Sequence, residues 1–157
     1  MAHLLRRIVR TGLIAGAVGT TAMDLLWFKR QRDEGSTVSF PDWEFGKGIS
    51  NFEEAPAPAR VGRVAARAVK VELPDSTAAL ANNVVHWSTG ATWGVAAATL
   101  RAVPGIGAIK AGFLAAIAAW TTSYAVLPKI GVYKSITEYD AKTLWKDLSA
   151  HLVFGTA

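Results

Sequence analysis

The stretch STAALANNVVHWSTGATWGVAAATL, residues 76–100, decides the fold of this chain, because its 25 consecutive residues include no Asp, Glu, Lys or Arg. A helix needs only about 20 predominantly apolar residues to cross the hydrocarbon layer of a bilayer. The stretch therefore predicts a helix that belongs in a membrane, and we expect lipid to surround much of the chain.

The composition of the whole chain agrees with this expectation. Its 157 residues suit one domain, and with 51% of them hydrophobic and only 18% charged, most of its side chains favour an apolar environment. The absence of cysteine excludes disulfides, thiolate metal sites and cysteine nucleophiles. The net charge is +5, but the chain lacks the interleaved aromatic and basic residues that are typical of nucleic-acid binders. We therefore expect anionic membrane lipids, and no nucleic acid, as partners of the positive charge.

Helical segments can be placed along the chain from runs without charge and from turn residues. Arginines precede the first apolar run, which continues without a cleavage site and is read as a retained helix rather than a signal peptide. Only about ten apolar residues follow Asp147, half the length of a span, so the last helix either docks as a partial helix or extends past the chain shown. The spanning helices are predicted at about 8–28, 76–100 and 106–127, with the fourth, partial or spanning, at about 137–157.

A further helix is predicted at about 59–72, between the first two spans. It carries basic residues at helical spacing and small apolar residues on its other face, and Pro74 ends it. This pattern is typical of a helix that lies in the membrane interface. We expect four residues to contact lipid headgroups: Arg60, Arg63, Arg67 and Lys70. The fold predicted for residues 1–157 is thus a single, all-α, polytopic membrane bundle with one interfacial amphipathic helix.

Rows of small residues mark the predicted first and second spans. Their members are Gly12, Gly16, Gly19, Gly90 and Gly94. In lipid, such rows permit close backbone contact between helices. We expect them to mediate helix packing, including association with a second copy or with a larger membrane complex.

Polar residues recur within the apolar helices at a repeated spacing. Asn82, His86 and Gly90 are four residues apart, and Asp147, His151 and Gly155 repeat the pattern. Such residues must face the protein interior, where the simplest role is hydrogen bonding between helices. The predicted intramembrane polar cluster comprises Asp24, Asn82, Asn83, His86, Asp147 and His151, with Lys29, Arg30 or Asn82 as the expected partner of Asp24.

Two functional alternatives follow from this cluster. His86 and His151, from different helices, could ligate a b-type haem or a metal ion in a redox carrier, with Asp147 orienting His151. A small transporter or proton-conducting protein would instead need a water-accessible path past Asp24 and Asn82. No phosphate loop, HExxH pair, nucleophile elbow or paired-carboxylate motif is present, so no enzyme activity is predicted.

Three short patches of the chain resemble the YagU-like family of small bacterial inner-membrane proteins. The patches are GAVGTTAMD at residues 16–24, His86 and Trp87 with Gly90, Trp93 and Gly94, and HLVFG at residues 151–155. The resemblance implies a compact helical, multi-pass protein of the inner membrane, without catalytic residues to carry over. The predicted role is therefore a non-enzymatic accessory or stress-related component of a membrane assembly, with no cofactor.

Overall fold

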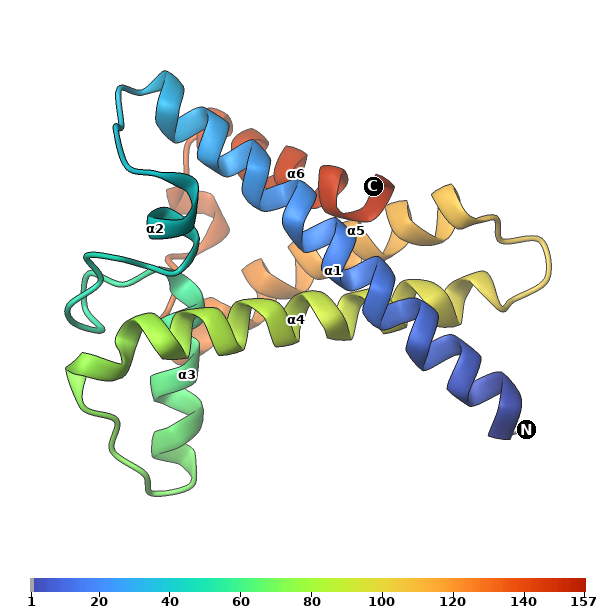
Figure 1. The fold of residues 1–157 in the computed structure, drawn as a ribbon, viewed down its shortest axis with the longest axis horizontal. Coiled ribbons are helices and arrows are strands. Elements are labelled where there is room, and N and C mark those ends of the chain that lie inside the picture. Colours follow the sequence, from blue (N-terminus) through green and yellow to red (C-terminus); the bar gives the residue numbers. More distant parts are fainter. Residues whose placement is uncertain (1) are drawn as a thin grey trace.

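The computed structural model describes residues 2–157, and in that part of the chain the regular structure is entirely helical. Four long helices form a bundle, and shorter helices occupy the connections between them (Figure 1). The elements are α1 (Ala2–Asp33), α2 (Phe40–Glu44), α3 (Ala57–Ala68), η1 (Asp75–Thr77), α4 (Ala78–Arg101), α5 (Ala108–Val126), η2 (Leu127–Ile130), η3 (Ile136–Glu138) and α6 (Ala141–Thr156).

The glycine rows lie where α1 and α4 cross, and Figure 1 shows the two helices forming an X. A methyl group added at Gly94 would collide with the backbone of Gly12 and Gly16, and one added at Gly16 would collide with the backbone of Gly90. The absence of side chains thus lets the two backbones approach closely. Contacts between α1 and α4 within the chain occupy these rows.

A second pair of helices, α5 and α6, repeats this arrangement. Gly112 of α5 and Gly155 of α6 face each other so closely that a Cβ on either would overlap the backbone oxygen of the other. Gly19 of α1 lies against Phe154, which connects α6 to the first pair. The last helix therefore docks against both α1 and α5.

The long connection between α1 and α4 folds back on the bundle. Phe52 is fully buried in a small cluster with Ala55, Ala59 and Ala78, and its backbone N–H donates to the Asp75 carboxylate. In α2, the side chain of the N-cap residue Ser39 accepts from the Asp42 N–H, as expected for a serine at that position. This connection covers one side of the helices at the end where the polar residues lie.

The helix boundaries agree with the predicted segments to within two residues except at four ends: both ends of the first helix, the end of the interfacial helix, and the start of the last helix, which begins at Ala141 and not at about 137. The first helix begins at Ala2 and continues to Asp33, beyond the predicted span of 8–28. The predicted interfacial helix was expected to reach residue 72 but ends at Ala68. There Lys70 adopts a left-handed conformation with φ 61°, and the Val71 N–H bonds to the Ala66 carbonyl, which closes the helix.

Two helical segments within residues 2–157 are long and apolar enough to cross a membrane: Ala2–Asp33 and Ala108–Ile130. These are weak evidence of membrane association, because length and composition alone define them. The helix α4 is not among them, since its Asn, His, Ser and Thr residues reduce its hydropathy although it carries no charge before Arg101. The structure thus supports a helical bundle with two such segments, and three or four spans are not confirmed.

Candidate functional site

A cavity of about 600 Å³ lies at the centre of the polar region. Side chains from α1, α4, α5 and α6 line it, together with residues of α2 and the start of α3. Five of the six residues of the predicted polar cluster line this one cavity: Asp24, Asn82, His86, Asp147 and His151. The fold therefore gathers residues that are far apart in sequence into one partly enclosed polar site.

The closest polar contact at the cavity joins α1 to α4. The Nε2 atom of His86 is 2.8 Å from Asp24 Oδ1 and 3.1 Å from Oδ2. Asp24 is only 3% exposed. Its expected partners were Lys29, Arg30 or Asn82, and this prediction is wrong, because Lys29 pairs with Asp33 and Arg30 reaches α6.

The second histidine is held within its own helix. His151 Nδ1 lies 3.0 Å from the Asp147 backbone carbonyl and 3.5 Å from its Oδ1 atom. The other carboxylate oxygen, Asp147 Oδ2, is buried and forms no hydrogen bond within residues 2–157, and the Tyr124 side chain of α5 is the neighbouring hydroxyl group. Asp147 thus contacts His151, as the sequence pattern suggested, and it also keeps a buried acceptor atom without a partner.

Two further oxygen atoms at this wall lack partners among the described residues. They are Asn82 Oδ1 on α4 and Thr20 Oγ1 on α1, which lies against Gly90 where the two helices cross, and both atoms are buried. Asn83, in contrast, donates to the Ala79 carbonyl of its own helix and does not line the cavity. Asn82 and Asn83 therefore have different roles although they are neighbours in the sequence.

Glu44 is a cavity residue that the sequence analysis did not identify. It lies at the end of α2, and its Oε1 atom accepts a hydrogen bond of 3.0 Å from the Trp87 indole N–H of α4. Burial raises the pKa of Glu44 above its ordinary value, and the nearby charge of Asp24 adds to the increase. The sequence signal for Glu44 was a carboxylate within the aromatic segment Phe40–Phe45. The sequence did not show that Trp87, on a distant helix, is its partner.

Tyr133 also lines the cavity, from the connection between η2 and η3. Burial, together with the charge of Asp147, raises the pKa of Tyr133 to about 12. Its hydroxyl group, like that of any protonated tyrosine, can donate a hydrogen bond. Tyr133 also packs against Tyr124 and Tyr139, with ring centroids 5.3 and 6.2 Å apart.

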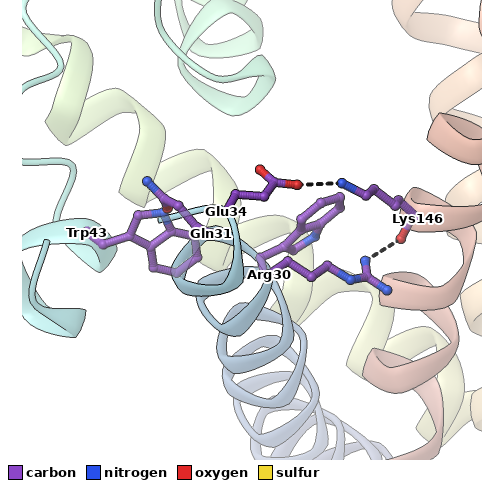
Figure 2. A pocket seen from close by; sticks show the side chains of 6 residues that line it. Arg30, Gln31, Glu34, Trp43 and Lys146 are labelled. Atoms are coloured by element: carbon purple, nitrogen blue, oxygen red, sulfur yellow. Dashed lines mark hydrogen bonds and ion pairs between the residues drawn. The ribbon is translucent and has the colours of Figure 1, made fainter. Parts of the chain in front are cut away.

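A smaller pocket of about 220 Å³ adjoins the cavity between α1 and α6. Figure 2 shows Glu34 and Lys146 joined by an ion pair of 2.6 Å, with Arg30 donating to the Lys146 carbonyl at 2.7 Å. Lys146 lowers the pKa of Glu34 by its hydrogen bond and its charge. These contacts connect the C-terminal end of α1 to α6 next to the cavity, since Trp27, Gln31 and Trp43 line both spaces.

The four residues expected at lipid headgroups lie on or just after α3. The guanidinium of Arg63 is 5.2 Å from the centre of the Phe52 ring, and Arg67 pairs with Glu72 at 3.3 Å. Arg60 is half-buried, and its Nε atom has no partner within residues 2–157. Lys70 is exposed in the turn after the helix.

The contacts that His86 and His151 make determine whether these residues are available to ligate a haem or a metal ion. His86 and His151 line the same cavity, but Asp24 holds the Nε2 atom of His86 and the Nδ1 atom of His151 faces Asp147. Ligation through His86 Nε2 would require its bond to Asp24 to break. No group of three His, Cys, Asp or Glu side chains in residues 2–157 is placed to hold a metal ion.

Comparisons with family models, with curated proteins and with solved structures find no match to this chain.

Proposed function

We propose that this chain is a non-enzymatic, multi-pass protein of the bacterial inner membrane that binds a small polar solute in its central cavity, as a small transporter would. The observation that carries the proposal is the distribution of polarity. Carboxylates and histidines from several helices meet at one internal cavity, whereas large apolar side chains cover the outside of the same helices.

The outer surface supports the membrane location. Ile14 on α1, Val84 on α4 and Ile109 on α5 are 58%, 59% and 76% exposed. The positions buried between helices are mainly Gly and Ala. A soluble bundle buries its large aliphatic residues, so this reversed pattern favours lipid as the outer solvent.

The proposal includes α4 as a third span. Its 24 residues extend about 36 Å at 1.5 Å per residue, enough for a bilayer. Its polar residues Asn82 and His86 line the cavity rather than the outer surface, where lipid would penalise them. The basic residues of α3 would then lie near the headgroups of anionic lipids.

The arrangement of the polar groups favours solute binding over catalysis. The Asp24 and His86 pair resembles two members of a catalytic triad. Within residues 2–157, however, neither His86 nor His151 forms a hydrogen bond with a serine or threonine hydroxyl. Ser123, at the cavity wall, donates instead to the Ala119 carbonyl. The cavity therefore offers charged and hydrogen-bonding groups that suit a bound solute.

Single-cysteine labelling tests this proposal directly, because the chain contains no cysteine of its own. Ser123 lines the cavity on α5, whereas Ala118 and Ala125 are exposed on the same helix. In intact membranes, a small water-soluble thiol reagent should modify the Ser123→Cys variant and leave Ala118→Cys and Ala125→Cys unmodified until detergent is added. The two alanines bracket Ser123 along the helix, so depth alone cannot explain this result.

Equal modification of all three cysteines in membranes would contradict a lipid-covered outer face. Recovery of the protein in the supernatant after ultracentrifugation of broken cells would do the same. Failure to modify Ser123→Cys, in a variant that retains its helical circular dichroism, would contradict a water-accessible cavity.

An accessory role in a larger membrane assembly is a second candidate, and Trp145 favours it. This side chain is 63% exposed on α6, while the opposite side of that helix packs on α1 and α5. Large exposed aromatic residues are frequent in protein interfaces. The mass of the complex in mild detergent tests the role, because co-purifying subunits that Trp145→Ala removes would establish it.

A further inference from the structure

We propose that the central cavity binds a protonated primary amine, with its ammonium group held by the acceptor oxygens of the wall and its apolar part against the tryptophan rings. This inference rests on the proposed function as a solute-binding membrane protein and specifies the chemical class of the solute.

The hydrogen-bonding capacity of the wall is the first argument. The buried atoms Asn82 Oδ1 and Asp147 Oδ2 have no hydrogen-bond partner within residues 2–157. Amide and carboxylate oxygens only accept hydrogen bonds. A ligand that satisfies them must donate, and a primary ammonium group carries three N–H donors.

The charge of the wall is the second argument. Carboxylates from three elements line the cavity: Asp24 of α1, Glu44 of α2 and Asp147 of α6. Three basic side chains also line it, and each lies against a carboxylate: the Lys47 Nζ atom is 3.0 Å from Asp42, His86 Nε2 is 2.8 Å from Asp24, and His151 Nδ1 is 3.5 Å from Asp147. Glu44 has no such basic partner among them. An anionic solute would therefore meet like charges, whereas a cation would be attracted.

The size and the aromatic lining indicate an organic cation rather than a bare metal ion. About 600 Å³ falls within the usual range of small-molecule sites. The rings of Trp43 and Trp93 line the cavity, and tryptophan faces attract cations. At the edge of the same cavity, the Arg30 guanidinium already lies 5.0 Å from the centre of the Trp27 ring. As noted above, no three side chains of the described residues are placed to hold a metal ion.

Calorimetric titration of the full chain in mild detergent at pH 7 tests the inference with three probes of similar size. These are 2-phenylethylamine, which is cationic, 2-phenylethanol, which is neutral, and 3-phenylpropionate, which is anionic. We expect the amine to bind at least tenfold more tightly than either of the other two. Binding of the neutral or the anionic probe with equal or higher affinity would overturn the inference and leave the proposed solute binding intact.

Variants locate the site. Asp147→Asn should weaken binding of 2-phenylethylamine at least tenfold without a comparable change for 2-phenylethanol, while Asp33→Asn, at an exposed ion pair outside the cavity, should have no effect. If Asp147→Asn does not fold, Asn82→Ala serves the same purpose, because it removes the acceptor and alanine is compatible with the helix. Unchanged amine binding in a folded variant of either kind would overturn the assignment. No binding of any probe at millimolar concentration would overturn the proposed function as well.

Discussion

His86 Nε2 lies 2.8 Å from Asp24 Oδ1, and this contact joins α4 to α1 across a separation of 62 residues. Because an ionised carboxylate only accepts hydrogen bonds, the Nε2 atom must carry the proton. Asp24 thus fixes the orientation of the imidazole ring at the cavity wall. It also connects the two helices whose glycine rows are in contact.

Replacing Asp24 tests the strength of this contact. We expect Asp24→Ala to lower the free energy of unfolding by about 2–3 kcal/mol, because a buried donor loses a charged acceptor. Asp24→Asn should lose less, since its amide oxygen can still accept from Nε2. Thermal unfolding in detergent, followed by circular dichroism, measures both. The exposed pair of Lys29 and Asp33 is the control, where Asp33→Ala should change stability by less than about 1 kcal/mol.

The contact of α1 with α4 predicts a large effect of a single methyl group. Gly94→Ala would place its Cβ against the backbone of Gly12 and Gly16, which cannot move aside without separating the helices. We expect a loss of stability of about 3 kcal/mol or more, the upper end for overpacking. Gly62→Ala on α3 is the matched contrast, because its Cβ would meet side-chain atoms at 3.2 and 3.4 Å. There the gain in helix propensity, up to about 1 kcal/mol, should compensate. Equal effects at the two positions would contradict the close helix contact.

The raised pKa of Glu44 predicts that the stability of the folded chain depends on pH. Its folded pKa lies above the ordinary value of 4.5, so the folded state binds more protons than the unfolded state between the two values. Stability due to this group therefore decreases as pH rises through that window, and below 4.5 the effect is absent. Glu44→Gln removes the charge and keeps an acceptor for the Trp87 indole. It should be at least as stable as the native chain at pH 7 and should vary less between pH 4 and pH 7. A steeper pH dependence in the variant would contradict the assignment.

The left-handed backbone conformation of Lys70 predicts that glycine at this position would stabilise the fold. Its φ of 61° is unfavourable for a side chain with a Cβ and is readily adopted by glycine. Lys70→Gly should raise the melting temperature, with a gain of up to about 1 kcal/mol. Lys110→Gly, within the first turn of α5, should instead lower it by up to about 1 kcal/mol. A lower melting temperature for Lys70→Gly would argue against the left-handed turn.

The bond between His86 and Asp24 also predicts the outcome of haem titration. Because the Nε2 atom is occupied, added haemin should not produce the visible spectrum of a low-spin complex with two histidine ligands. Absorbance of the purified protein during titration measures this directly. A low-spin spectrum that His86→Ala and His151→Ala each abolish would establish the haem carrier instead.

Local features explain why much of the helical fold could be predicted. The uncharged run at residues 76–100 predicted α4 to within two residues at its start and one at its end, because charge, proline and glycine act on the backbone nearby. The end of α3 was wrong by four residues, because no proline or glycine marks the turn at Lys70. The polar stripe of Asn82 and His86 identified one wall of the cavity for the same local reason, the helical periodicity of 3.6 residues.

The sequence by itself determined the helices, their small-residue faces and the polar character of one stripe on α4 and on α6, because these depend on neighbours within a few turns. The tertiary structure alone decided that His86, and not a nearby lysine, is the partner of Asp24, and that the glycine rows face each other within one chain. It also brought Glu44 and Tyr133 to the same cavity as Asp147. The physical reason is that these contacts depend on how the helices cross, and the crossing is set by packing between residues far apart in the chain.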